Sequence, residues 1–115
     1  MQYTCVAIIA ARPGHLDEVL RKSELELLPL YREVPGFVAY TVAKTGDSAA
    51  IAFSLWQTRQ QAEQSIRTSE TWMQEGTSGL IDSIKNHVGE LPFLAFSRDL
   101  SVYASPAATP AGRLV

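Results

Sequence analysis

Residues 35–56, with the sequence PGFVAYTVAKTGDSAAIAFSLW, decide the fold of this chain. Two apolar runs, 37–42 and 49–55, are joined by the short polar connection Thr45-Gly46-Asp47-Ser48. Aromatic and β-branched residues favour a pleated, packed surface, and glycine beside aspartate is typical of turns. The stretch therefore predicts a β-hairpin.

A helix is predicted before the hairpin, over residues 15–34. Its apolar residues recur at three-and-four spacing opposite a charged face, and Asp17 and Glu18 lie in the first turn, where the helix dipole favours acidic groups. Pro29 removes a backbone donor within this helix, which predicts a kink or break near residues 27–28. Pro35-Gly36 ends the helix and begins the hairpin.

A second helical region is predicted after the hairpin. Thr58 followed three residues later by Gln61 matches a capping box, so a helix should begin there. Apolar residues then recur at spacings of four or seven through residue 88. This pattern predicts two helical pieces, with a bend near residue 69, a weak spot near residue 77 and Gly89 as the C-terminal cap.

The remaining apolar runs lie near the two ends of the chain. Residues 3–11 are nearly continuously apolar and predict a strand covered on both faces. Residues 92–103 predict a last strand, bent around Arg98-Asp99. We therefore expect one domain over residues 1–103, followed by a flexible tail or dimer arm over residues 104–115, which is rich in Ala, Pro, Ser and Thr.

The predicted order of elements is strand, helix, strand, strand, helix, strand. This order corresponds to an α+β, ferredoxin-like βαββαβ fold with a four-stranded antiparallel sheet and both helices on one face. Alternate residues of the first strand are Tyr3, Cys5, Ala7 and Ile9 against Thr4, Val6, Ile8 and Ala10, so neither face is polar. Because a bare apolar face would be left exposed, we expect a homodimer that pairs through the sheet face.

Composition narrows the classes of partner. The 115 residues are 46% hydrophobic, with ten basic and twelve acidic residues and a formal charge of −2. This balance provides no basic excess for nucleic acid or an anionic membrane, so neither partner is expected. The longest apolar run, residues 5–11, is too short to span a bilayer. Cys5 is the single cysteine, which predicts a reducing, cytoplasmic setting.

Three short motifs resemble the antibiotic biosynthesis monooxygenase (ABM) domain family of the dimeric α+β barrel superfamily. They are Arg12-Pro13-Gly14, Val34-Pro35-Gly36-Phe37 and Ser54-Leu55-Trp56-Gln57-Thr58, and the resemblance covers roughly residues 2–103. It implies that the sheet pairs into a dimeric α+β barrel. The family includes cofactor-independent monooxygenases of aromatic polyketides and quinols, heme-degrading enzymes, and many members with no assigned activity.

The heme-degrading branch of that family is disfavoured by the residues of this chain. Ala7, Ser65 and Glu75 (or Gly76) stand where that branch has asparagine, tryptophan and an iron-ligating histidine. Of the two histidines, His87 is explained as a solvated residue near a helix end, whereas His15, just after a turn at a strand end, has the better claim to a function. No cluster has metal-ligand spacing, so neither a metal nor another cofactor is expected.

A cofactor-independent monooxygenase needs an apolar cavity, aromatic walls and a polar group for a phenolic substrate. The candidate pocket residues are Trp72, Tyr40, Phe53, Tyr31 and Met73, with Arg12 or His15 as the polar partner. Trp72 is of particular interest because its indole can stack on a flat ligand. The ligand implied is a small apolar or aromatic molecule.

Two other classes of function stay open at this point: a small-ligand-binding protein without catalysis, and a purely structural dimer. A monooxygenase requires a cavity lined by Trp72 or Tyr40 and one ionisable group. A binding protein requires the cavity without that group. A structural dimer would have the space filled by side chains.

Overall fold

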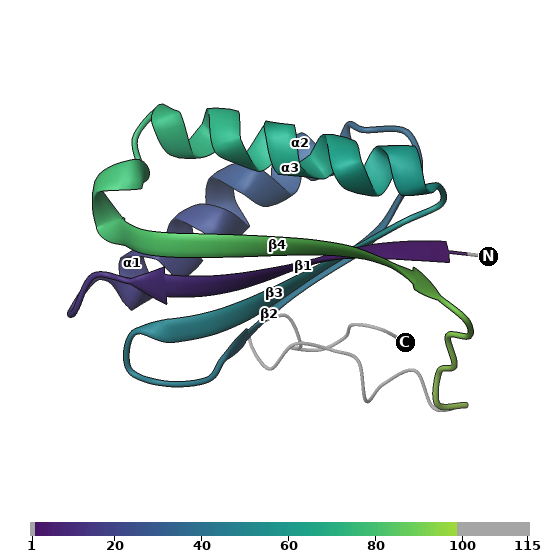
Figure 1. The fold of residues 1–115 in the computed structure, drawn as a ribbon, viewed down its shortest axis with the longest axis horizontal. Coiled ribbons are helices and arrows are strands. Elements are labelled where there is room, and N and C mark those ends of the chain that lie inside the picture. The colour runs from purple at the N-terminus through teal and green to yellow at the C-terminus, as the bar shows by residue number, and fades with distance from the viewer. Residues whose placement is uncertain (1, 99–115) are drawn as a thin grey trace, which may run out of the picture.

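The computed structural model describes residues 2–98 as one sheet covered on one face by helices (Figure 1). The elements are β1 (Gln2–Ala11), α1 (Leu16–Lys22), the π-helical segment η1 (Ser23–Leu27), α2 (Leu28–Arg32), β2 (Phe37–Lys44), β3 (Ala49–Trp56), α3 (Arg59–Gln74), the 3₁₀ turn η2 (Ser78–Leu80) and β4 (Ile81–Leu91). The strand order is β2-β3-β1-β4, and every neighbouring pair is antiparallel. The predicted ferredoxin-like α+β fold is therefore confirmed.

The predicted hairpin forms from β2 and β3 and lies at one edge of the sheet. Its polar connection closes through backbone hydrogen bonds from Thr45 N–H and Gly46 N–H to the carbonyl of Ala49. A β-bulge between Phe37 and Ala39 shifts the register with β3. Because of this bulge, Phe37 shares the helix-covered face with Tyr40 instead of alternating away from it.

The first helix changes type where the sequence predicts a break. Leu28 N–H donates to the carbonyl of Ser23, five residues back, so one π-helical segment separates α1 from α2. Pro29 lies in the first turn of α2 and lacks a backbone donor. A π segment moves the preceding carbonyl away from the proline ring and lets the helix resume.

The predicted capping box at the start of α3 is present. Thr58 Oγ1 accepts from Gln61 N–H, and Gln61 Oε1 accepts from Thr58 N–H, each at 3.1 Å. Gly36 lies against this cap with φ +86°, and a Cβ at that position would overlap the side-chain amide of Gln61. The helix stop at Gly36 and the helix start at Thr58 are therefore packed together.

The end of the second helical region was predicted wrongly. The helix ends at Gln74, and Ile81–Leu91 form the edge strand β4 where a helix capped by Gly89 was expected. Leu80, Ile84 and Val88 recur every four residues, a spacing that fits a strand of period two as well as a helix. His87 consequently lies on the exposed face of β4, opposite Val6, and not at a helix end.

The last predicted strand, residues 92–103, is also wrong as far as the structure describes it. Residues 92–98 follow β4 without forming a strand, and Phe93 and Phe96 are exposed. Residues 99–103 and the expected tail, 104–115, lie outside the described residues. No helix within residues 2–98 is long and apolar enough to cross a membrane.

The sheet has one covered face and one open face. Cys5, Ile9, Ala52 and Trp56 are buried beneath the helices. The open face is formed by the alternate residues Thr4, Val6, Ile8 and Ala10 of β1, Ala39 and Thr41 of β2, Ile51, Phe53 and Leu55 of β3, and Ser83, Lys85 and His87 of the edge strand β4. Ile8 is 46% exposed and Phe53 36% exposed on this face. The part of this face formed by β1, β2 and β3 is therefore mainly apolar, as the sequence predicts, and β4 gives it a polar edge.

Candidate functional site

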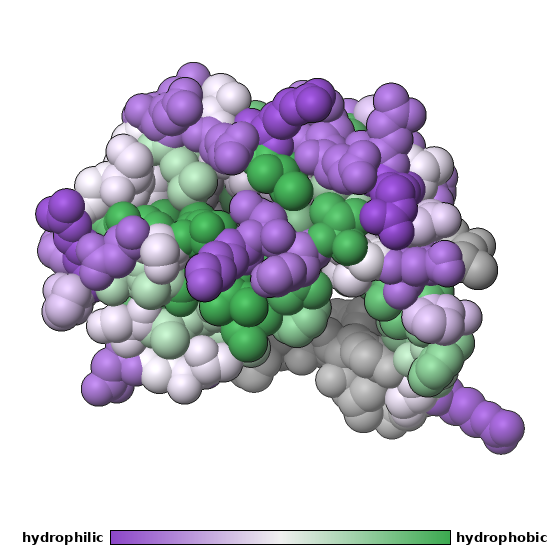
Figure 2. Space-filling model, viewed as in Figure 1, coloured by the Kyte–Doolittle hydropathy of each residue, from purple (hydrophilic) through white to green (hydrophobic). Residues whose placement is uncertain are grey.

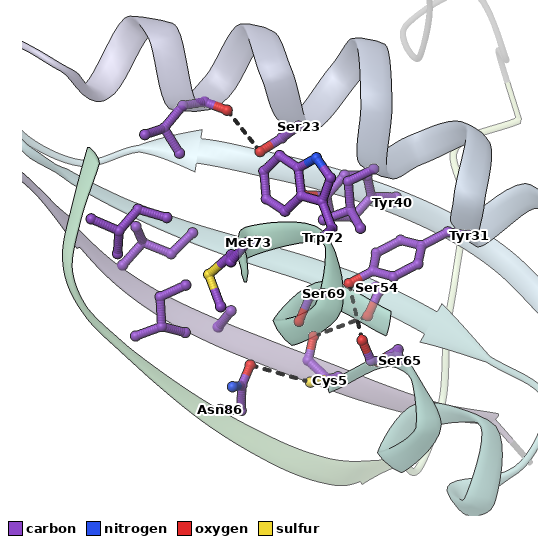
Figure 3. Close-up of a pocket in the computed structure, with 17 residues that line it drawn as sticks. Cys5, Ser23, Tyr31, Tyr40, Ser54, Ser65, Ser69, Trp72, Met73 and Asn86 are labelled. Atoms are coloured by element: carbon purple, nitrogen blue, oxygen red, sulfur yellow. Dashed lines mark hydrogen bonds between the residues drawn. The ribbon is translucent and has the colours of Figure 1, made fainter. Parts of the chain in front are cut away.

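A small internal cavity lies between the covered face of the sheet and the helices (Figure 3). Its volume is about 40 Å³. The apolar wall is formed by Ala7, Ile9, Val19, Leu27, Ala52, Trp72, Met73, Ile81 and Ile84, and the polar wall by Cys5, Ser23, Tyr31, Tyr40, Ser54, Ser65, Ser69 and Asn86. Every layer of the domain therefore contributes to the cavity.

The cavity lies where two core clusters meet. One cluster is built around Ile9, Leu16 and Val19, and the other around Tyr31, Trp56 and Trp72. Small residues of β3, such as Ala52 and Ser54, line the floor between them. Small side chains leave space that large neighbours do not fill, which accounts for the void.

Most polar groups of the cavity are already tied to the backbone. Ser23 Oγ donates to the carbonyl of Val19 at 2.9 Å, and Ser65 Oγ donates to that of Ala62 at 2.6 Å. Tyr31 Oη donates to the carbonyl of Ser65 at 3.5 Å. These hydroxyls fix the shape of the walls, because each has a partner that the fold supplies.

Asn86 is different, because one half of its amide is uncommitted. Its Oδ1 accepts from Cys5 Sγ at 3.8 Å, a weak contact between β4 and β1 (Figure 3). Its NH₂ group donates to no residue within the described range 2–98. The amide nitrogen is thus a hydrogen-bond donor available to a ligand.

The ionisable groups that line the cavity are neutral near pH 7. Burial raises the pKa of the Cys5 thiol, and Ser65 partly offsets that rise. Burial likewise raises the pKa of Tyr31, with smaller contributions from Tyr40 and Cys5, and raises the pKa of Tyr40. Because no Asp, Glu, Lys, Arg or His among residues 2–98 lines it, the cavity is suited to an uncharged molecule.

Trp72 forms the wall of the cavity that faces α1 and η1. Its side chain is 7% exposed, and its indole Nε1 donates to Glu26 Oε1 at 3.0 Å. Tyr40 and Tyr31 extend the aromatic lining, with ring centroids 5.1 Å apart in an edge-to-face arrangement. An indole held by a hydrogen bond at its edge offers a fixed face to a flat ligand.

The structure brings four of the seven predicted pocket residues together: Trp72, Tyr40, Tyr31 and Met73. Phe53 lies on the open face, opposite Val6 and Thr41. Arg12 and His15 lie beyond the end of β1, where Arg12 Nε is 3.7 Å from Asp82 Oδ1 and His15 Nδ1 is 3.6 Å from Glu18 Oε1. Neither polar candidate lines the cavity.

Sequence reasoning missed Cys5 and Asn86 as lining residues. The sequence predicts a helix at Asn86, but the residue lies on the covered face of β4, between Ile84 and Val88. A polar residue at an inward position between two apolar ones is the signal that a strand assignment would have revealed. Within residues 2–98, no group of three or more His, Cys, Asp or Glu side chains is placed to hold a metal.

Solved structures with the same fold include two oxygenases and a candidate antibiotic biosynthesis monooxygenase. The cofactor-independent oxygenase SnoaB of Streptomyces nogalater is 13% identical, with a TM-score of 0.61 over 81% of this chain and 95% of that one. The ActVA-Orf6 monooxygenase of Streptomyces coelicolor, solved in complex with Nanaomycin D, is 18% identical, with a TM-score of 0.65 over 83% and 91%.

The candidate antibiotic biosynthesis monooxygenase of Chloroflexus aurantiacus is 19% identical, with a TM-score of 0.63 over 84% of this chain and 98% of that one. No protein-family model and no curated protein matches the sequence. At these identities the likeness is one of fold. The chain therefore has the fold of the antibiotic biosynthesis monooxygenase structures.

Proposed function

We propose that this chain is an ABM-type protein that binds a small, uncharged aromatic compound in its internal cavity and oxygenates it without a cofactor. The observation that carries the proposal is a neutral cavity lined by Trp72, Tyr40 and Asn86, whose NH₂ group donates to no residue within 2–98. The fold shared with two oxygenases supports it, one of them named as cofactor-independent.

The reaction we propose needs only the substrate and dioxygen. In an anthrone-type phenol, a CH₂ group flanked by two rings becomes a C=O group. The CH₂ carbon gives up four electrons: two go to the oxygen atom that enters the product as C=O, and two go to the other oxygen atom, which leaves as water with the two hydrogens of the CH₂ group. A quinol or polyketide-like ring that is equally easy to oxidise can likewise react with dioxygen without an added reductant. Such chemistry places no demand for a metal or flavin on the protein.

The side chains of the cavity would act by positioning and by excluding water. The Trp72 indole packs against the ring, and the Asn86 NH₂ group donates to the substrate oxygen, where negative charge grows as the ring gives up electrons. The apolar wall keeps the reactive carbon dry. The lining hydroxyls and thiol would not take the substrate proton, because they stay protonated near neutral pH.

The cavity, as it stands, is too small for the proposed substrate. A cavity of about 40 Å³ is smaller than a ring-sized ligand requires. An apolar cavity of roughly 150 Å³ is needed to hold benzene. A two- or three-ring substrate therefore has to displace a side chain that lines the cavity.

A second candidate function is binding of the same ligand class without catalysis. It is favoured by a specific observation, namely that no charged side chain lines the cavity to act as a base near pH 7. A purely structural role fits less well, because the interior retains a void and an uncommitted amide.

We also propose that two copies pair through the open face of the sheet. Ile8 and Phe53 are exposed large apolar residues of that face, and a partner sheet would remove them from water. The free thiol of Cys5 supports a reducing, cytoplasmic location as part of the same proposal.

Oxygen uptake tests the proposed activity. The protein, treated with a chelator, is mixed with anthrone-type phenols and quinols in an oxygen electrode, and uptake is compared with that of Trp72→Ala. Catalysed uptake that is lost in the variant supports the oxygenase. Tight binding of the same compounds without catalysed uptake identifies a binding protein instead.

A further inference from the structure

Four side chains separate the internal cavity from a surface groove between the end of α3 and β4. The groove has a volume of about 440 Å³ and is lined by Glu70, Met73, Gln74, Ser78, Ile81, Ile84 and Asn86. Four of these residues, Met73, Ile81, Ile84 and Asn86, also line the cavity. These four side chains form the partition: Ile81, Ile84 and Asn86 extend from β4, and Met73 extends from α3. Figure 2 shows hydrophobic residues gathered below α3, on the side of the molecule where β4 lies.

Met73 is the movable part of this partition. Its side chain is half-buried and unbranched, and it makes no polar contact within residues 2–98 that would hold it in place. Methionine changes rotamer at low cost and repacks against aromatic surfaces. Figure 3 shows its thioether lying over the cavity on the side of Asn86. Rotation of this one side chain would join the cavity to a groove large enough for a small ligand.

The other two neighbouring grooves are closed by better-anchored residues. The groove between α2 and α3, about 390 Å³, shares only Trp72 with the cavity, and the indole is hydrogen-bonded to Glu26. The groove between α1 and β2, about 430 Å³, shares Ser23 and Tyr40. Ser23 is tied to the Val19 carbonyl, and the Tyr40 ring packs edge-to-face on Tyr31. Opening either route would break these contacts.

The geometry points to Met73 as the entrance to the cavity and to Asn86 as the residue that selects the ligand's oxygen. A flat aromatic ring enters between α3 and β4 when Met73 swings away, and it comes to rest against the fixed indole of Trp72. Its hydroxyl or carbonyl oxygen accepts a hydrogen bond from the Asn86 NH₂ group. Glu70 is the charged residue that lines the groove, and its carboxylate favours neutral over anionic rings.

This inference deepens the proposed function because it names the entry route and the ligand's polar contact, yet it can stand without catalysis. Binding of 2-naphthol, which is fluorescent and uncharged at neutral pH, is followed by stopped flow. We expect Met73→Ala to raise the association rate constant by on the order of tenfold, since an open state populated at about a tenth or less limits entry. Met73→Phe should lower it.

Leu30→Ala is the matched control, because it widens the groove on the other side of Trp72. It should leave the association rate unchanged. An unchanged association rate in Met73→Ala, or a rate that changes in Leu30→Ala instead, would contradict the assignment of Met73 as the entrance. Thermal unfolding of each variant verifies that it is folded before the rates are compared.

The contact with Asn86 is tested by comparing 2-naphthol with naphthalene, which lacks the oxygen. We expect Asn86→Leu to weaken 2-naphthol binding about fivefold, the size of one hydrogen bond, and to leave naphthalene binding unchanged. Equal loss for both ligands would overturn the assignment.

If the rates respond as expected but no oxygen is consumed, the entrance stands and the oxygenase proposal fails. If 2-naphthol does not bind at all, the entrance fails as well.

Discussion

The indole nitrogen of Trp72 lies 3.0 Å from Oε1 of Glu26, a contact that joins α3 to the π-helical segment η1. Glu26 is also paired with Lys22, whose Nζ lies 3.8 Å from Oε2. One carboxylate thus holds the aromatic wall of the cavity and the helix that covers it. The wall is fixed from outside, which leaves the opposite side of the cavity, at Met73, free to move.

Loss of this carboxylate should destabilise the protein slightly. We expect Glu26→Ala to lower the free energy of unfolding by about 1 kcal/mol, near the low end for a charge-assisted hydrogen bond because the carboxylate is half-exposed. Glu26→Gln retains an acceptor and should lose less than half as much. Urea unfolding measures both. Lys22→Gln is the control for the ion pair alone, and a loss as large as that of Glu26→Ala would contradict the role of the indole contact.

Gly36 and Gly14 offer a matched pair for the role of the capping box. Both have positive φ, +86° and +82°, but only Gly36 lies against another side chain, that of Gln61. We expect Gly14→Ala to cost about 1 kcal/mol of stability from backbone strain. Gly36→Ala should cost roughly 1 kcal/mol more, because the new Cβ pushes Gln61 out of the cap. Chemical denaturation of both variants gives the difference.

The same comparison in a Gln61→Ala background isolates the cause. Without the Gln61 side chain, the two glycine substitutions should cost equal amounts. If Gly36→Ala keeps its excess in that background, the excess comes from the backbone and the packing described at the cap is not responsible.

Stability should fall at alkaline pH because of the buried tyrosines and thiol. The ordinary pKa values are 9.0 for Cys5 and 10.0 for Tyr31 and Tyr40, and burial raises all three in the folded chain. Above these ordinary values the unfolded chain loses protons that the folded chain keeps, so the free energy of unfolding decreases as pH rises. Each group contributes a slope of up to about 1.4 kcal/mol per pH unit.

Tyr31→Phe tests that assignment. Denaturant unfolding from about pH 8 to pH 11 should show a shallower decrease in the variant than in the wild type, by the contribution of one group. At neutral pH the variant should be slightly less stable, because Tyr31 loses its hydrogen bond to the Ser65 carbonyl. Parallel curves for variant and wild type would show that Tyr31 ionises equally in both states.

A charge on the open face should separate the proposed dimer. We expect the wild type to sediment at twice the 12.6 kDa mass of one chain, and Phe53→Lys to sediment as a monomer. Leu25→Lys is the control, because Leu25 is an exposed apolar residue of η1 in the helix layer. A wild-type monomer at micromolar concentration, or a dimer that survives Phe53→Lys, would contradict pairing through this face.

The sequence predicted those elements whose local signals agree with one another. The runs in β1, β2 and β3 are apolar on both faces, and the Thr58–Gln61 pair marks the start of α3 by its own chemistry. For β4 the signals conflict. Its outward residues Lys85 and His87 are polar, and its apolar inward residues Ile84 and Val88 are four positions apart, as on one face of a helix. Only the need for a fourth strand beside β1 resolves the ambiguity.

The candidate site was predicted in part for the same reason. Trp72, Met73 and Tyr31 were placed on helices that cover the sheet, so they converge on its interior. Phe53 points away, because the face to which a strand residue belongs depends on a register that the sequence does not state. Asn86 could not be found while β4 was assigned to a helix.

Transfer of oxygen from isotopically labelled dioxygen to an anthrone-type phenol tests the central claim most directly. Chelator-treated protein is incubated with the substrate under labelled dioxygen in ordinary water, and the product is examined by mass spectrometry. The expected result is a quinone that carries one labelled oxygen atom, formed at a rate that falls in Trp72→Ala and Asn86→Leu. Product formed no faster than without protein, or without the label, would contradict the account.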